Sequence, residues 1–177
     1  MKFSHLISCL VVCVSLTGCG ITASSASDGY ADLDSLGSVD VEQTMSLSLG
    51  PTLLKFASMN VDHDPDTKIV LEGLDGVRVK TYDVVGNQAR VGERIDRMSS
   101  KLQEQGWMPI VWVREHNERT VMLVKTVDER ILGITVLNTD LREAVVINVM
   151  GELRPEMFAE TMAALDVDAP VENLPAF

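Results

Sequence analysis

The sequence contains few aromatic, histidine and basic residues. Aromatic residues make up 5% of the 177 positions, there are three histidines, and 15 lysines and arginines stand against 26 aspartates and glutamates, for a formal net charge of -11. A protein that binds nucleic acid needs a basic surface for the phosphates, so this balance argues against a nucleic-acid partner. The glycines form neither a P-loop nor a dinucleotide-binding motif, and we expect no cofactor.

Cysteine is confined to the start of the chain, at Cys9, Cys13 and Cys19. An apolar run from Leu6 to Leu16 follows a short opening with one lysine. This run is too short to cross a bilayer as a helix, which takes about 20 residues, but it suits the central part of a secretory signal. We therefore expect residues 1–18 to be a signal peptide.

The four residues Leu16-Thr17-Gly18-Cys19 resemble the lipobox of bacterial lipoproteins. The resemblance implies that Cys19 becomes the first residue of the mature chain and carries acyl chains such as palmitate, which attach it to a lipid bilayer. Gly20 in the next position, in place of Asp, implies delivery to the periplasmic face of the outer membrane. An ordinary signal peptide or an uncleaved anchor is the alternative. Cleavage before Cys19 leaves the mature chain without a thiol for catalysis, disulfides or metal binding.

Two flanking segments have the composition of loose chain. Residues 19–38 are rich in Ser, Gly, Ala and Asp and show no apolar period, which predicts a flexible tether after the lipidated cysteine. Residues 20–44 contain five acids and no base, an acidity that we expect to keep the tether solvated and away from anionic lipid. Residues 166–177 predict a loose acidic tail. Residues 39–165 remain as one domain, in keeping with the length and the apolar fraction.

Apolar periodicity in the first half of this domain predicts strands and short helices. Alternating apolar residues from Val39 to Leu49 predict a strand with one buried face. Residues 51–59 predict a short helix with Pro51 at its first position. Residues 64–74 predict a second helix, with a strand as the alternative, and residues 77–82 alternate as a strand.

The second half predicts one long helix and a run of hairpins. Apolar residues at steps of three and four predict an amphipathic helix over residues 87–106. Four apolar runs follow, separated by short polar stretches: 108–113, 121–127, 131–137 and 144–150. Such short connections make hairpins, because a parallel crossover needs a dozen or more residues. We predict an α+β fold, with an antiparallel sheet that ends in a four-strand meander, helices packed mainly on one face, and a last helix around Met157–Leu165.

Three of these runs, 110–113, 121–124 and 144–147, are apolar at consecutive positions. A sheet with one solvated face alternates apolar and polar residues, so these runs predict hydrophobic side chains on both faces. We therefore expect the second face to meet either the short helices within residues 51–74 or a partner. That partner would be a second copy of the chain or another envelope protein.

Four short segments serve as landmarks: Leu74–Tyr82, Gly106-Trp107, Ile131–Val136 and Glu143–Gly151. Together they resemble a family of bacterial lipoproteins known as a domain of unknown function, DUF4252, over about residues 39–165. The resemblance implies a strand-helix-strand start before a meander, and genes beside an extracytoplasmic sigma factor imply an association with envelope-stress regulation. It implies no catalytic residue. Glu152 departs from the basic residue that the family pattern has after Gly151.

The densest cluster of metal-ligand types is Asp62-His63-Asp64-Pro65-Asp66. The acids Asp62, Asp64 and Asp66 have the spacing of the first, third and fifth positions of a calcium loop. However, Thr67 replaces the turn glycine, and Gly73 stands where a bidentate acid is needed. We interpret the cluster as a polar turn that caps a helix, with a metal site as the alternative.

The remaining candidates are one histidine and one tryptophan. His116 is predicted at a solvated hairpin tip. Trp107 and Trp112 flank the first meander strand, and Trp112 is the one we expect at the surface, where it is a weak candidate for binding. We expect a non-catalytic, envelope-anchored lipoprotein that binds a protein or ligand. A metal-dependent hydrolase that uses the Asp62–Asp66 cluster, or a purely structural surface protein, is the alternative.

Overall fold

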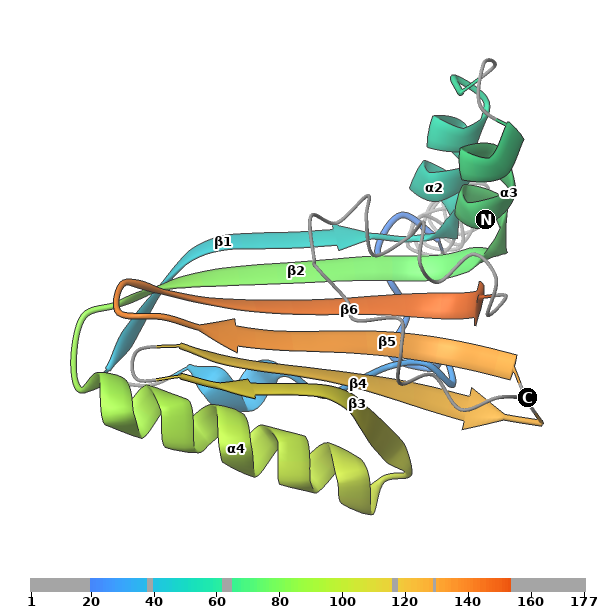
Figure 1. Cartoon of the computed structure of the whole chain (residues 1–177). Coiled ribbons are helices and arrows are strands. Elements are labelled where there is room, and N and C mark those ends of the chain that lie inside the picture. Colours follow the sequence, from blue (N-terminus) through green and yellow to red (C-terminus); the bar gives the residue numbers. More distant parts are fainter. Residues whose placement is uncertain (1–19, 38–39, 62–64, 116–117, 129, 154–177) are drawn as a thin grey trace, which may run out of the picture.

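The computed structural model describes residues 20–37, 40–61, 65–115, 118–128 and 130–153 (Figure 1). Six antiparallel strands form one sheet in the order β1-β2-β6-β5-β4-β3. The strands are β1 (Val41–Leu49), β2 (Leu74–Val84), β3 (Trp107–Arg114), β4 (Arg119–Val127), β5 (Arg130–Thr139) and β6 (Glu143–Leu153). The helical elements are η1 (Asp34–Leu36), α2 (Pro51–Ser58), α3 (Pro65–Gly73) and α4 (Gln88–Glu104). The predicted α+β class and the C-terminal meander of β3 to β6 are confirmed.

The order of the strands follows from two kinds of connection. Consecutive strands from β3 to β6 pair as hairpins, and β6 then returns to lie beside β2. The α2 and α3 helices are inserted between β1 and β2, which still pair with each other. Residues 65–73 form a helix rather than the alternative strand. The last predicted helix, around Met157–Leu165, and the predicted tail lie outside the described residues.

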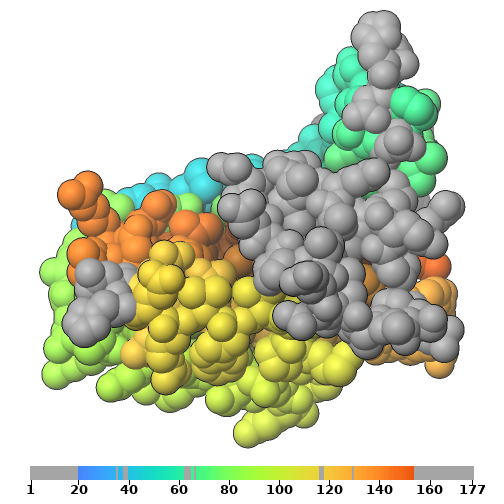
Figure 2. Space-filling model, in the orientation of Figure 1, coloured from blue at the N-terminus to red at the C-terminus, as the bar shows by residue number. Residues whose placement is uncertain are grey.

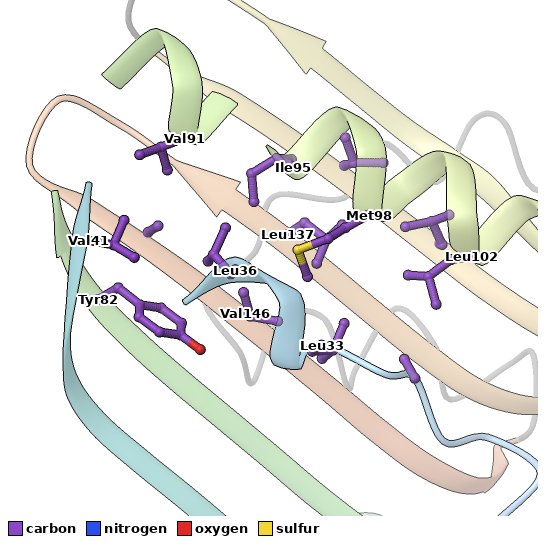
Figure 3. Packing of buried hydrophobic residues seen from close by; sticks show 14 of the residues in the cluster. Leu33, Leu36, Val41, Tyr82, Val91, Ile95, Met98, Leu102, Leu137 and Val146 are labelled. Carbon is purple, nitrogen blue, oxygen red and sulfur yellow. The ribbon is translucent and has the colours of Figure 1, made fainter. Parts of the chain in front are cut away.

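The α4 helix covers one side of the sheet, which we call the first face. The Asn87 side chain caps the helix by accepting a hydrogen bond from the Arg90 backbone N–H at 3.3 Å. Figure 3 shows the apolar stripe of α4, which includes Val91 and Ile95, turned toward Leu137 of β5. Residues at steps of three and four share one side of a helix, so the predicted amphipathic period accounts for this packing.

Residues 20–37 also pack on the first face, although we predicted a flexible tether there. Ala31, Leu33 and Leu36 are at most 2% exposed. Gly29 approaches β5 so closely that an added Cβ would lie 1.8 Å from the Leu132 carbonyl oxygen. The prediction is wrong for these residues because their low apolar content does not reveal long-range contacts: Ala31 bonds to a residue of β6 that is 117 positions away.

That residue is Asn148, which is fully buried. Its Oδ1 accepts from the Ala31 backbone N–H at 3.0 Å, and its Nδ2 donates to the Gly29 carbonyl at 3.0 Å. The same Nδ2 lies 3.2 Å from the Thr135 hydroxyl oxygen. A buried amide is stable only where its polar atoms find partners. Asn148 therefore fastens the N-terminal segment to the middle of the sheet.

The acids of this segment pair with basic residues of the domain. The Asp34 carboxylate contacts Arg78 and Lys80 of β2, and Asp32 lies 3.0 Å from the Lys101 Nζ of α4. The hydrogen bond from Lys101, helped by the Asp34 backbone N–H, lowers the pKa of Asp32. We expected these two acids to keep a flexible tether solvated. Instead, they pair with basic side chains on the first face.

The other side of the sheet, the second face, is crossed by two rows of paired apolar residues. One row consists of Leu47, Val79, Ile147, Val136, Met122 and Val111, and the other of Leu49, Val77, Val149, Ile134, Val124 and Met108. The prediction of two apolar faces is therefore confirmed. The helices α2 and α3 meet the second face at one end of the sheet, where Leu54 and Leu71 join its apolar cluster. Among the described residues, no helix is long and apolar enough to cross a membrane.

Candidate binding surface

The predicted metal cluster is not assembled in the described part of the chain. Asp62, His63 and Asp64 lie outside the described residues, as do Cys19 and His116, and so does the side chain of Asp66. Within the described ranges, no three His, Cys, Asp or Glu side chains gather closely enough to hold a metal ion. The metal site therefore stays a prediction from the sequence.

The two tryptophans divide as expected between core and surface. Trp107 is 2% exposed, and Trp112 is 46% exposed on β3. The Arg114 guanidinium carbon lies 5.8 Å from the centre of the Trp112 ring. Such a contact is a cation–π interaction. Trp112 thus already contacts a charged neighbour at the surface.

A cleft of about 300 Å³ lies between the start of α4 and the hairpin that joins β3 to β4. Both of its arginines bind the same carboxylate: the Asp96 Oδ2 accepts from Arg114 at 3.0 Å and from Arg119 at 2.9 Å. Gly92 leaves room for this pair, since an added Cβ would lie 2.6 Å from the Arg119 Nη1. The cleft also contains Glu115, Glu118 and Thr139.

The charged residues of this cleft hold α4 and the β3–β4 hairpin together. Its arginines are engaged by Asp96, and the acids Glu115 and Glu118 would repel an anion. The hydroxyl of Thr139 donates to the Glu143 carbonyl at 3.2 Å, which leaves it poorly suited as a nucleophile. A nucleophile needs a base and an open line of approach to the substrate. The cleft therefore supports no catalytic hypothesis.

Exposed apolar side chains lie on β3, at Met108, Trp112 and Val113, and at two further places that are next to each other in the sequence. The first, which we call the β1 edge, comprises Met45 and Leu47, which are 46% and 41% exposed. They lie on the second face of β1, the outermost described strand on that side of the sheet. From Met45 to Leu49 the strand pairs with β2 without a bulge, so it presents a regular outer edge.

The second place, the α2 patch, comprises Leu53, Phe56 and Met59. Their exposed fractions are 39%, 67% and 59%. Steps of three residues place them on one side of the helix, and Leu54 and Ser58 are buried on the opposite side. The pair formed by α2 and α3 projects from the body of the molecule (Figure 2). Large apolar side chains on a projecting helix are typical of surfaces that bind something apolar.

Local sequence explains how these surfaces arise. Gly50 ends β1 in an extended conformation, and Pro51 begins α2, where its missing N–H costs no hydrogen bond. The first residues of the described chain hold this junction. The Gly50 N–H donates to the Ile21 carbonyl at 2.7 Å, and the Thr52 N–H donates to the Gly20 carbonyl at 2.9 Å. The start of α2 is therefore fixed to residue 20.

Sequence reasoning expected the second face to meet the short helices or a partner, but it did not identify the residues of either surface. The alternation from Val39 to Leu49 correctly predicted a strand, but the face that we expected to be buried is exposed at Met45 and Leu47. The α2 helix was predicted, although nothing in its apolar pattern distinguished the exposed side from the buried one. The only signal in the sequence was that apolar residues occur on both sides of the helix, with Leu53, Phe56 and Met59 on one side and Leu54 on the other. A helix that is apolar on both sides either lies in a core or binds a partner.

A family model described as "Domain of unknown function (DUF4252)" matches residues 38–161. No curated protein and no solved structure matches the chain. The matched range includes all six strands and the helices α2, α3 and α4. The chain therefore belongs to the DUF4252 family.

Proposed function

We propose that this protein is a non-catalytic, lipid-anchored binding module of the bacterial envelope, and that it binds a protein partner through the β1 edge. The observation that carries the proposal is the exposure of Met45 and Leu47 on an outer strand that pairs with β2 without a bulge from Met45 to Leu49. An exposed strand edge with apolar side chains invites pairing with another chain.

The geometry favours an extended partner segment. A strand added to a sheet edge gains main-chain hydrogen bonds, and its alternate side chains contact those of the edge strand. Met45 and Leu47 are two residues apart, which is the repeat of side chains on one face of a strand. The opposite edge, β3, also exposes Met108 and Trp112. It is less suitable because Pro109 lies within that strand and has no backbone N–H to donate to an added strand.

The anchor is supported by the lipobox resemblance at Leu16–Cys19. We propose that Cys19 is acylated and holds the protein at the periplasmic face of the outer membrane. Replacement of Cys19 by serine should abolish the incorporation of labelled palmitate and move the protein from the membrane fraction to the soluble fraction. Equal labelling of the wild type and the Cys19→Ser variant would rule out the anchor.

A non-catalytic role is supported by the cleft between α4 and the β3–β4 hairpin, whose two arginines are both engaged by Asp96. The association with envelope-stress regulation remains a proposal that rests on the family resemblance. It predicts that the partner is an envelope protein with an extended apolar segment. The partner can also be a second copy of this chain, because the β1 strands of two copies can pair with each other in an antiparallel arrangement.

Chemical crosslinking in intact cells tests the β1 edge. A tagged full-length chain should give a crosslinked adduct of reproducible mass, and the variant with Met45→Asp and Leu47→Asp should lose it. The matched control is Ser46→Asp, because Ser46 is exposed on the same strand but lies on the first face. An adduct that survives the double substitution, or that Ser46→Asp removes equally, would overturn the proposed surface.

A further inference from the structure

Gly20, the residue that follows the anchor position Cys19 in the sequence, is bound to the start of α2. Its carbonyl accepts a hydrogen bond from the Thr52 N–H in the first turn of α2. The predicted tether of about nineteen residues would have let the domain stand clear of the lipid. Because residues 20–37 are packed against the sheet instead, the described chain leaves no such spacer between the anchor position and the domain.

The surface next to this position is apolar. The α2 patch exposes Leu53, Phe56 and Met59, and α3, which packs against α2, exposes Ile69 by 44%. Lys55 lies in the same helix, and a lysine can bury its methylene chain while its ammonium group stays in water. Aromatic and aliphatic side chains on one side of a short helix are the means by which proteins bind at the surface of a bilayer.

We propose that the α2 patch docks on the lipid surface beside the acylated cysteine. The acyl chains and the patch would then be two attachments on one corner of the molecule. The second attachment becomes intramolecular once the first has formed, so even a weak patch would be occupied. The inference deepens the proposed function, because it rests on a lipid at residue 19, but it does not depend on the β1 edge or its partner.

This docking would orient the sheet relative to the membrane. The turn between β5 and β6 lies at the opposite end of the sheet from α2 (Figure 1). β6 has 11 residues, which corresponds to about 35 Å at roughly 3.3 Å per residue. The β1 edge runs between these two ends and would remain open to a partner in the periplasm.

Apolar contact, rather than charge, must drive the docking. The chain has a net charge of -11, and an acidic protein gains nothing from an anionic lipid surface. We therefore expect docking on zwitterionic vesicles and little change between low and high salt, because salt screens charges but does not weaken apolar contact.

The test attaches the chain to lipid chemically, so that its outcome does not depend on natural acylation. The chain from Cys19 to Phe177 has one cysteine, which can be coupled to a maleimide phospholipid in phosphatidylcholine vesicles. Hydrogen exchange measured by mass spectrometry should then slow at residues 51–59 by several-fold relative to the uncoupled chain. Exchange in the outer side of α4 and in the β5–β6 turn should stay unchanged.

Two variants complete the test. Phe56→Ser together with Met59→Ser should remove the added protection of residues 51–59 on vesicles. Leu141→Ser is the matched control, because Leu141 is 55% exposed but lies in the β5–β6 turn, and it should leave the protection intact. Residues 51–59 that exchange equally on and off the vesicles, or protection that survives the double substitution, would overturn the docking. A protein that docks when coupled but is not acylated in cells would refute the anchor alone.

Discussion

The two ends of the sheet differ in chemistry. At the α2 end, the exposed side chains include Leu53, Phe56 and Met59, and the first described residues of the chain contact the helix. At the other end, the β3–β4 hairpin and the β5–β6 turn carry acids and arginines, among them Glu118 and Asp140. A charged end is suited to water and an apolar end to a ligand or a lipid surface. The exposed apolar side chains are therefore grouped on one helix at the α2 end, whereas at the other end Val85 and Leu141 stand singly among charged residues.

The largest expected effect is at the α2 end. Leu54 is 3% exposed and belongs to the apolar cluster of the second face. Leu54→Ala should lower the free energy of unfolding by about 2–4 kcal/mol, because it removes buried methyl groups and leaves a cavity. Leu141→Ala at the charged end is the matched control and should change it by less than about 0.5 kcal/mol. Equal losses in urea denaturation would contradict the burial difference.

The next effect concerns the link between the N-terminal segment and the sheet. Asn148→Ala leaves the Ala31 N–H and the Gly29 carbonyl without their partner. An unsatisfied buried group costs about 1–3 kcal/mol, so we expect a loss of that size and faster proteolysis within residues 20–37. Asn138→Ala is the control, because Asn138 is only half-buried and bonds to the side chains of Thr120 and Glu118. A proteolysis rate equal to that of the wild type would show that the segment is not fastened there.

The smallest effect is a pH dependence at the charged end. Backbone N–H groups of Arg142 and Glu143 donate to the Asp140 carboxylate at 2.7 and 2.8 Å and lower its pKa from 3.8. A carboxyl group with a lower pKa in the folded state stabilises the fold above its unfolded pKa, and this contribution is lost as the pH falls through the folded pKa. Asp140→Asn should therefore flatten the acid side of the stability curve slightly. An unchanged slope between pH 5 and pH 2 would contradict the assignment.

Hydrophobic periodicity predicted most of the fold. The period of the residues from Val91 to Leu102 predicted α4, and the short polar connections predicted the meander, because both signals are local. The N-terminal segment could not be predicted in this way. Its position depends on Gly29 and on a single buried amide, Asn148, in a distant strand, and neither residue stands out in a local pattern.

The candidate surfaces were predictable only in part. Alternation identifies a strand, but it does not say whether a neighbouring element covers the apolar side, and nothing in the described structure covers Met45 and Leu47 enough to bury them. In the same way, the apolar pattern of α2 predicts a helix but does not say whether another element covers Phe56. The candidates that the sequence did suggest have different outcomes: Trp112 is exposed as expected, whereas the Asp62–Asp66 cluster lies largely outside the described residues.

The central claim is that the α2 end, and not the charged end, faces the bilayer. A fluorophore at Met59→Cys or at Leu141→Cys, in the acylated protein reconstituted into phosphatidylcholine vesicles with spin-labelled lipids, tests it most directly. Both positions are exposed, by 59% and 55%, so they differ mainly in which end of the sheet they report. We predict strong quenching at position 59 and little at position 141. Equal quenching, or stronger quenching at position 141, would contradict the claim.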